Sequence, residues 1–364
     1  MGGQTTIDGR IPIAFPPGGA PSPGAEGRPA FPSDFSSAPF TLAWETTRAC
    51  PLRCVHCRAD AQTRRDPNEL DTDEGLDLIR QAAEMGVSVF VITGGDPLAR
   101  PDVFELLGAV DRSGMHAGFS PSVTPRLTPA ALGRAVESGA STIHLSLDGA
   151  SAETHDGFRG VSGSFDRTIT SIGVASGLDA RLQVATTVSR RTVADLPDVV
   201  GLLEGKVSVW TLFFVVPTGR AAADQMLDPH EHERVLEWLV TTDFPFAVRT
   251  IASPTFRRVR IQHGLGAGPG VSDGNGFCFV SHHGDVCPSG FLQQSAGNVR
   301  DAPLAHWYRE SPLFTSLRDP SLLKGKCGRC EFALTCGGSR ARAWAVTGDH
   351  LASDPSCAYE PRGG

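Results

Sequence analysis

The sequence predicts an α/β fold in which a parallel sheet curls into a partial barrel. From Phe40 onward, short apolar runs alternate with segments that have the spacing and the caps of helices. Strands that alternate with helices are joined by right-handed crossovers and lie parallel, so the sheet is doubly wound or curls toward a barrel. Six expected strands indicate a partial (β/α)6 TIM-type barrel.

The expected strands are apolar runs of a length that suits a buried strand, and the expected helices have helical spacing and capping residues. The strands span residues 40–46, 87–93, 117–120, 142–147, 182–188 and 207–216. The helices span residues 72–85, 101–113, 129–138, 164–176 and 193–203. In parallel barrels the reactive groups lie at the carboxyl ends of the strands, so motifs that follow these strands are the candidate site.

The rest of the chain divides into a leader, a linker and a small cysteine-rich α+β domain. Residues 1–38 are rich in Gly, Pro, Ser and Ala and cannot bury enough apolar surface to order themselves, so we expect a flexible leader. The barrel follows at 39–250. A linker at 251–276 ends in a Gly-rich stretch, and the small domain occupies 277–364.

Beyond the sixth strand the pattern loosens. We expect a helix near 229–240 and an irregular basic segment at 249–260. A hairpin is expected at 277–281 with its turn at 283–285, and a helix near 304–309 precedes the cysteine-rich tail.

Composition excludes several classes of function. The 364 residues have a net charge of -7 and a pI of about 5.9, whereas a general nucleic-acid surface needs an excess of Lys and Arg. There is no run of about 18 apolar residues and no secretory signal, so we expect no membrane role and a cytoplasmic location. The 9 cysteines fall mostly in close groups, which favours metal ligation over disulfides.

Cys50, Cys54 and Cys57 directly follow the first expected strand and are the most informative group. Iron–sulfur clusters are usually held by four Cys thiolates, so three clustered cysteines without a nearby fourth leave one iron open to a substrate or cofactor. Pro51 disfavours a helix here, so we expect a loop wrapped around its metal. The alternatives are a zinc site and three buried thiols without metal.

Gly94, Gly95, Asp96 and Pro97 follow the second expected strand. Two glycines at a strand end let the backbone approach a ligand more closely than a side chain would allow. The alternative is a plain strand-to-helix turn, because Gly-Asp-Pro is common turn chemistry.

These motifs, together with His56 before the third cysteine, resemble those of the radical S-adenosylmethionine (SAM) enzymes over roughly residues 40–216. The resemblance implies a 4Fe-4S cluster on the three cysteines, with SAM chelating the open iron through its amino and carboxylate groups. One electron would then cleave SAM to methionine and a 5′-deoxyadenosyl radical, which takes a hydrogen atom from the substrate. Such enzymes need a one-electron reductant such as flavodoxin or ferredoxin.

The resemblance also implies which residues contact SAM. His56 and the turn of residues 94–97 would bind it, with the turn at the amino group, where the family most often has Glu in place of Asp96. Ser146, Asp148 and Arg159 correspond to residues that bind the ribose and the carboxylate, and a guanidinium fork suits a carboxylate. Val215 would flank the adenine. The alternative for Arg159 is an exposed arginine without a ligand, and the alternative for Val215 is ordinary core packing.

A second group of four cysteines lies in the tail and could complete a cluster with no open iron. Its members are Cys327, Cys330, Cys336 and Cys357. The tail resembles the SPASM extension, which holds auxiliary clusters in many radical SAM enzymes, and this implies a second 4Fe-4S cluster; a structural zinc site is the alternative. Arg340 and Ser289 stand where a full SPASM module has cysteines, which argues against a further auxiliary cluster. We expect Cys278 and Cys287 to be buried thiols, and the alternatives are remnants of a ligand set or partial ligands.

The tail from Cys336 to Cys357 is similar to that of radical SAM proteins that modify tetrapyrroles in alternative haem synthesis. Such substrates carry several carboxylates, which need cations. The candidates near strand ends are Arg190, Arg191, Arg220, Arg249, Arg257 and Arg258, although charge clusters are commonly solvated faces.

Other functions remain open. The enzymatic alternatives are a SPASM-type maturase of a ribosomally made peptide and a dehydrogenase or epimerase of a small natural product. The alternative outside enzymology is an iron–sulfur electron-transfer or sensor protein. The substrate, the fate of SAM and the oligomeric state do not follow from the sequence.

Overall fold

The computed structural model describes residues 5–7, 11–13 and 34–362. Most of the expected leader therefore lies outside the described residues, apart from β1 (Thr5–Ile7) and β2 (Ile11–Ile13), which pair antiparallel. Residues 34–38 are placed against the C-terminal part of the chain. The carbonyl of Phe35 accepts a hydrogen bond from Tyr308 Oη at 2.8 Å, and the Phe35 side chain is buried.

A curved parallel sheet forms the centre of the molecule, and all six strands expected from the sequence are part of it, with ends shifted by one or two residues. Each strand pairs in parallel with the next along the chain, in chain order, and the predicted fold class is confirmed. The strands are β3 (Thr41–Glu45), β4 (Val89–Thr93), β5 (His116–Phe119), β6 (Ala140–Ser146), β7 (Arg181–Val188) and β8 (Val209–Phe214).

A seventh parallel strand, β9 (Ala247–Ile251), pairs with β8. The prediction of an irregular segment at 249–260 was wrong, because β9 is followed by the helix α8 (Thr255–Gln262). β9 lies at the end of the sheet, where its side chains are exposed or half-buried. An edge strand does not need a continuous apolar run. β9 includes the charged Arg249, so it lacks the apolar pattern by which the other strands were predicted.

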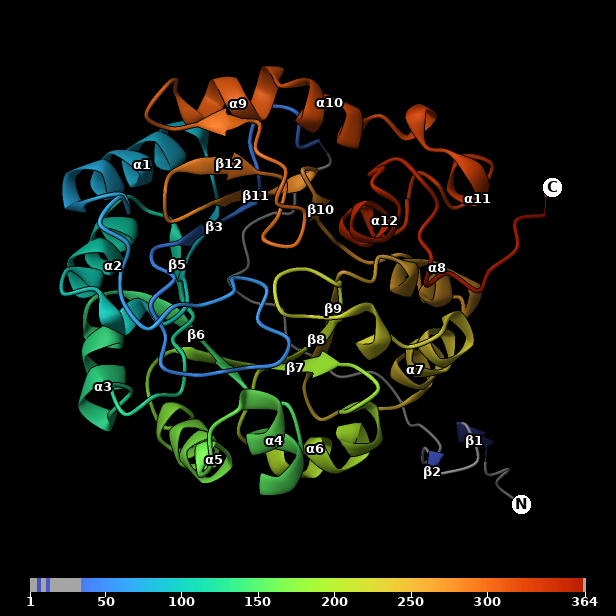
Figure 1. The fold of residues 1–364 in the computed structure, drawn as a ribbon, viewed down its shortest axis with the longest axis horizontal. Helices are drawn as coiled ribbons and strands as arrows, with labels where there is room; N and C mark the ends of the chain where they lie inside the picture. The colour runs from blue at the N-terminus through green and yellow to red at the C-terminus, as the bar shows by residue number, and fades with distance from the viewer. Residues whose placement is uncertain (1–4, 8–10, 14–33, 363–364) are drawn as a thin grey trace.

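Helices surround the outer face of the sheet (Figure 1). Those that the sequence predicted are α1 (Thr72–Met85), α2 (Val103–Arg112), α3 (Pro129–Glu137), α5 (Ser164–Ala175), α6 (Leu196–Leu203) and α7 (Pro229–Thr241). Asp71 and Glu74 form a capping box on α1, and Thr128 caps α3 ahead of a proline, which explains why these starts were predictable. None of the helices among the described residues is both long and apolar enough to cross a membrane.

The expected hairpin is confirmed, and it extends the barrel sheet. β11 (Gly276–Val280) pairs in parallel with β3 and antiparallel with β12 (Asp285–Cys287). β13 (Gly297–Asn298) continues the sheet beyond β12, and β10 (Ser272–Asp273) pairs beside β11. The stretch 251–276, expected as a linker, contains α8 and β10, and only the Gly-rich part between them is irregular.

The C-terminal segment is mostly helical. α9 (Leu304–Glu310) and α10 (Pro312–Arg318) cover the sheet beside α1 (Figure 1). The short α11 (Gly325–Gly328) and α12 (Arg340–Thr347) frame the cysteine-rich tail next to α8 (Figure 1).

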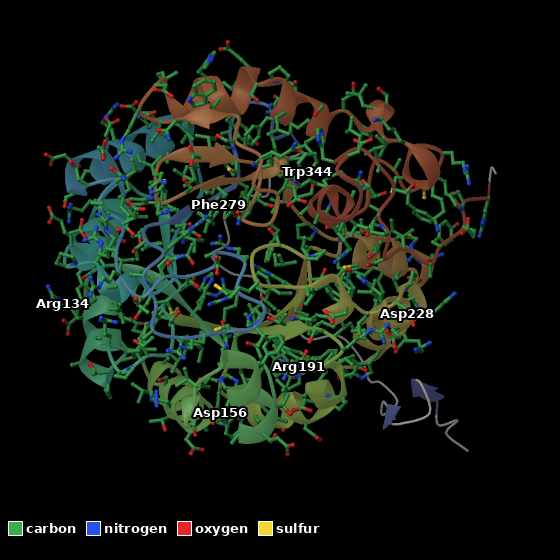
Figure 2. All side chains as sticks on the ribbon, viewed as in Figure 1. Arg134, Asp156, Arg191, Asp228, Phe279 and Trp344 are labelled. Atoms are coloured by element: carbon green, nitrogen blue, oxygen red, sulfur yellow. The ribbon has the colours of Figure 1, made fainter. Side chains whose placement is uncertain are left out.

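The apolar core lies between the sheet and its helices. β3 sends Leu42 and Trp44 outward to this layer, and both are fully buried. Its alternate residue Ala43 faces the barrel interior with Val91 and Phe279, which points inward from β11 (Figure 2). The period of two in a strand thus separates core residues from residues that face the barrel axis.

Gly75→Ala in α1 is expected to lower the free energy of unfolding by about 1–3 kcal/mol, because overfilling a close-packed site is costly. The added methyl would lie 2.4 Å from Cη2 of the buried Trp44 ring. Gly133→Ala in α3 is the matched control, since it would meet nothing within 4 Å and alanine favours helices. Urea unfolding of both variants at equal iron content measures the difference, and equal stability would contradict this packing.

Candidate functional site

The three cysteines of the first motif converge on the loop that follows β3. Cys50 and Cys54 are buried and pack together, and Cys57 packs against them half-buried. All 9 cysteines of the chain are free thiols. The loop crosses the mouth of the barrel at the carboxyl ends of the strands (Figure 1), as the sequence predicted.

The backbone of this loop packs against the glycine turn after β4. The amide of Gly95 donates to Thr47 O at 2.6 Å, and the amide of Asp96 donates to Ala49 O at 2.7 Å. A Cβ on Gly94 would lie 2.7 Å from Thr47 O, and one on Gly95 would lie 2.7 Å from Arg48 O. The glycines therefore permit close approach of the chain to itself, whereas the sequence suggested close approach to a ligand.

Asp96 is fully buried at the same strand end. Its carboxylate accepts from Thr124 Oγ1 at 2.9 Å and from the Leu98 amide at 3.2 Å, and Arg126 lies 3.8 Å away. Burial raises the pKa of this carboxyl, against the effect of these partners. Pro97 is buried and begins a 3-10 turn, Pro97–Ala99.

Sequence reasoning missed the residues that follow β5. Thr124 and Arg126 belong to this segment, as does Ser122, whose hydroxyl donates to Gly95 O at 2.5 Å. The Cys50 thiol lies 3.6 Å from the same hydroxyl. Their position after a predicted parallel strand was the available signal.

Asp148, Arg159 and Cys54 form a chain of contacts beside the thiols. Arg159 Nη2 pairs with Asp148 Oδ2, and Arg159 Nη1 lies 3.8 Å from Cys54 Sγ. Asp148 Oδ1 accepts from the Thr187 amide at 2.6 Å. Burial opposes ionisation of Asp148, but Arg159, the Thr187 amide and the other partners together outweigh it and lower the pKa of the carboxyl.

Arg159 is the last residue of α4 (Ala152–Arg159), a helix that the sequence analysis missed. The carbonyls of its last turn hold the cysteine loop, because the Arg53 amide donates to Arg159 O at 3.1 Å and the Val55 amide to Phe158 O at 3.0 Å. Arg159 is 13% exposed, so it is not the exposed arginine that was the alternative interpretation.

His56 stacks on Phe158 with ring centroids 4.2 Å apart and rings inclined by 13°. Burial lowers the pKa of His56 to about 3, so its imidazole is neutral. Its Nε2 lies 4.0 Å from Asp148 Oδ2. Ser146 is the last residue of β6 and is half-buried, next to the same strand end.

Several buried polar atoms around the cysteine loop have no hydrogen-bond partner. They belong to His56 (Nδ1), Arg159 (Nε), Arg220 (Nε and Nη2) and Gln225 (Oε1). Two of these residues adjoin the loop, because the Arg220 amide donates to Cys57 O at 3.0 Å and Gln225 Nε2 to Val55 O at 3.5 Å. Buried polar groups are normally satisfied, so this surplus beside three thiols fits a polar, partly anionic ligand on a metal cluster.

A cavity of about 370 Å³ opens on the loop and brings cations close to the first cysteine. Cys50, Arg53, Arg126 and Arg220 are among its lining residues. Among the six arginines suggested as substrate contacts, Arg220 alone lines this cavity. The sequence analysis named Arg220 as a candidate substrate contact, but it did not name Arg53 or Arg126.

Three of the other suggested arginines are engaged elsewhere. Arg190 donates to Met226 O, and Arg258 is buried and forms an ion pair with Glu233. Arg257 donates to the carbonyls of Thr335 and Val271.

Glu45, at the inner end of β3, is a fully buried acid to which the sequence analysis gave no role. Arg48 Nε lies 2.9 Å and Arg58 Nη1 2.8 Å from its carboxylate, and His282 Nδ1 lies 3.2 Å away. Burial alone would raise its pKa, but Arg58, His282 and Arg48 together lower it to about 2. This carboxylate joins the cysteine loop to the turn after β11.

The second group of four cysteines lines one small pocket in the tail, formed by residues around α11 and α12. Three donors point at its sulfur atoms: Arg340 Nη2 and the Asp354 amide lie 3.5 Å from Cys327 Sγ, and the Gly338 amide lies 3.4 Å from Cys336 Sγ. Burial raises the pKa of Cys336 to about 12. Four thiols with hydrogen bonds to sulfur fit a fully ligated cluster or zinc.

Cys278 and Cys287 lie on opposite faces of their hairpin. Cys287 pairs with Phe279 and faces the barrel interior, whereas Cys278 faces the outer apolar layer. Burial raises the pKa of both thiols. Ser289 accepts hydrogen bonds from the Phe291 and Leu292 amides, so it caps a turn. The expectation of buried thiols agrees with this placement.

Val215, expected beside adenine, is buried just after β8, and its carbonyl contacts the tail. Arg342 Nε donates to Val215 O at 3.3 Å, and Arg342 Nη2 donates to Ala252 O at 2.8 Å. Arg342 also pairs with the buried Asp354 at 3.2 Å, next to the second cysteine group. These buried hydrogen bonds join the segment after β8 to the second cysteine group.

Comparison with known proteins identifies the family. The profile of the Radical SAM superfamily matches residues 44–200. The chain is 37% identical over 343 residues to the AdoMet-dependent heme synthase of Methanosarcina barkeri, an alignment that covers 90% of this chain and 98% of that protein. This chain belongs to the radical SAM superfamily. Members of this superfamily use a 4Fe-4S cluster and SAM, as the sequence motifs predicted.

Other relatives of this radical SAM enzyme differ in their named activities. It is 31% identical to the Fe-coproporphyrin III synthase of Methanosarcina barkeri, and the alignment covers 87% of each chain. It is 32% identical to the mycofactocin maturase MftC of Mycobacterium ulcerans, with 88% of each chain covered. The SAM-bound crystal structure of SuiB from Streptococcus suis shares the fold, with a TM-score of 0.70 at 17% identity over 89% of this chain and 78% of that chain.

Glu45→Ala is expected to lower the free energy of unfolding by about 1–3 kcal/mol, because two arginines and a histidine lose a buried partner. Glu84→Ala is the matched control. Glu84 is 62% exposed and pairs only with Arg80, so its loss costs less than about 1 kcal/mol. Denaturant unfolding compares the two variants, and similar losses would show that Glu45 does not organise the site.

Proposed function

We propose that this enzyme binds SAM at the three-cysteine loop and modifies the propionate side chains of a tetrapyrrole haem precursor. The observation that supports the proposal is a group of three free, converging thiols at the carboxyl edge of the sheet, in a chain similar over most of its length to a haem synthase. Three thiolates leave a 4Fe-4S cluster one ligand short, so a chelating molecule can complete it.

In this proposal Cys50, Cys54 and Cys57 are the ligands of the SAM-binding cluster. Metal ligands must be thiolates, and burial raises the pKa of the Cys50 and Cys54 thiols, so metal binding displaces their protons. Arg159 lies close enough to Cys54 to offset the negative charge of the thiolates.

The SAM contacts are assigned by charge. Asp96, with its neighbours Gly94, Gly95 and Pro97, would receive the ammonium group, because a buried carboxylate prefers a cationic partner. Arg159 would bind the SAM carboxylate through its unpartnered Nε, held in orientation by Asp148. Ser146 and His56 would complete the polar wall, and Val215 the apolar wall beside adenine.

When bound, the cluster and SAM supply a one-electron cleavage that yields a carbon radical able to remove a hydrogen atom from the substrate. The residues of this chain bind, orient and exclude water. The His56–Phe158 stack closes the floor of the site, and the cysteine loop covers the barrel mouth.

We assign a second 4Fe-4S cluster to Cys327, Cys330, Cys336 and Cys357. Its four ligands leave no open iron, so its role is electron transfer or support of the fold. The buried Arg342, which contacts Val215 O and Asp354, would keep this cluster in a fixed position relative to the SAM site.

The tetrapyrrole assignment is supported by similarity and by charge. Identity to the haem synthase is 37% with 98% of that protein covered, against 32% with 88% covered for the peptide maturase. Arg53, Arg126 and Arg220 line the cavity beside the loop and would receive substrate carboxylates. Peptide maturation is the second candidate, because the maturase relative also aligns over 88% of this chain.

We further propose a flavodoxin or ferredoxin as the one-electron reductant and the cytoplasm as the location. A reducing compartment keeps thiols free for metal, which agrees with 9 free cysteines.

Cys54→Ala is expected to abolish SAM cleavage, because the cluster loses one of three protein ligands. Cys278→Ala is the matched control, a buried thiol that faces the apolar layer, and should keep SAM cleavage. Formation of 5′-deoxyadenosine under dithionite measures both. Normal turnover by the Cys54 variant, or equal loss in both variants, would contradict the ligand assignment.

Cys330→Ala is expected to remove about four irons per chain while some uncoupled SAM cleavage continues, since each cluster has its own cysteines. Cys287→Ala serves as the control and should leave the iron content unchanged. Iron analysis of anaerobically reconstituted protein measures both. An unaltered iron content in the Cys330 variant would favour the zinc alternative.

Anaerobic incubation with SAM, dithionite and Fe-coproporphyrin III tests the substrate class. We expect a product that forms only when SAM is present. It should have fewer carboxyl groups than Fe-coproporphyrin III, hence a lower mass, and the absorption spectrum of haem. Arg220→Met should raise the KM for this tetrapyrrole more than it lowers SAM cleavage without substrate. If SAM is cleaved but the tetrapyrrole is unchanged, the tetrapyrrole assignment is contradicted and a peptide substrate is favoured.

A further inference from the structure

Two histidines and an aspartate from distant parts of the chain meet at the turn after β11. His282 and His283 belong to this turn, and Asp66 belongs to the loop that precedes α1. One potential ligand atom from each of the three residues lies within 4.8 Å of the others. Neither the SAM site nor the second cysteine group uses these residues.

The distance between two of these ligand atoms is that expected around one ion. His283 Nε2 lies 3.2 Å from Asp66 Oδ2. Two nitrogen or oxygen ligands, each about 2.1 Å from a zinc-sized ion at tetrahedral to right angles, are about 3.0–3.4 Å apart. Small side-chain rotations would bring the third ligand atom to the same ion.

One nitrogen of each ring faces a carboxylate. Among the described residues, His282 Nδ1 and His283 Nε2 are buried atoms that make no hydrogen bond of good geometry, and each lies 3.2 Å from a carboxylate oxygen, of Glu45 and Asp66 respectively. The His282 side chain is 7% exposed. The two rings stack with centroids 3.9 Å apart and are inclined by 29°, so both imidazoles lie side by side at the turn.

The backbone holds both histidines in place without help from their rings. The carbonyl of His282 accepts from the Leu70 amide at 2.8 Å, and the carbonyl of His283 accepts from Asn298 Nδ2 at 2.9 Å. A site whose ligands are already positioned loses little entropy on binding an ion.

We propose that Asp66, His282 and His283 bind one divalent transition-metal ion of the zinc or ferrous class. Two imidazoles and one carboxylate suit such ions and leave coordination positions free. Asp66 and His283 are 38% and 37% exposed, so those positions open to solvent and can take water or an incoming carboxylate.

The ion would connect the loop before α1 to the turn after β11 at the mouth of the barrel. β11 runs parallel to β3, so its turn lies on the same edge of the sheet as the cysteine loop. Glu45 contacts both His282 and Arg58 of that loop, which gives the metal site a direct neighbour in the candidate SAM site. The proposal does not depend on the identity of the substrate.

Titration of the cluster-loaded protein with Co²⁺, followed by dialysis and EPR, tests the site, because oxidised 4Fe-4S clusters are EPR-silent and the cysteines are already occupied. We expect one Co²⁺ per chain beyond the iron. His283→Ala should weaken Co²⁺ binding by more than about 100-fold, since outer partners of a metal alone are worth about 10–100-fold.

His306→Ala is the matched control. His306 lies 3.2 Å from Glu310 on the exposed side of α9, and no third ligand stands beside this pair in the described part of the chain, so its loss should leave Co²⁺ binding unchanged. Iron content equal to that of the parent protein verifies that each variant is folded and loaded. Absence of Co²⁺ binding in the parent protein, or equal binding in the parent protein and the His283 variant, would overturn the proposal.

Discussion

The site depends on the close packing of the cysteine loop against two neighbouring segments, the glycine turn after β4 and the last turn of α4, which fix the position of its backbone. On one side the glycine turn after β4 presses against Thr47–Ala49 with no space for a Cβ. On the other, the last turn of α4 accepts amides of Arg53 and Val55. A loop held at both ends keeps its three cysteines in one packed cluster, which suits a pre-formed site.

A second constraint joins the two halves of the chain. β11 pairs directly with β3, so residues separated by more than two hundred positions form adjacent strands. Glu45 and Arg342 add buried charge to this junction, and each contacts both the barrel and the C-terminal segment. Breaking a buried ion pair is costly, so these charges help to hold the C-terminal segment on the barrel.

The sequence predicted the features that depend on local patterns. Capped helices such as α1, the parallel strands and the cysteine spacing all have short-range signals. β9 and α4 were missed, because an edge strand containing Arg249 and a polar helix of eight residues lack a continuous apolar pattern. Glu45 and Arg342 act through contacts with segments far away in the sequence, which no local signal indicates, whereas the position of Ser122 after a predicted strand was an available signal.

The central claim is that SAM coordinates an iron held by Cys50, Cys54 and Cys57. The most direct measurement is pulsed EPR of the reduced Cys330→Ala, Cys336→Ala double variant with SAM isotopically labelled at its amino nitrogen. Loss of two ligands leaves no three-cysteine site in the tail, so this variant isolates the signal of the first cluster. The account predicts a hyperfine coupling between the labelled nitrogen and the cluster. A spectrum that is the same with and without labelled SAM would contradict it.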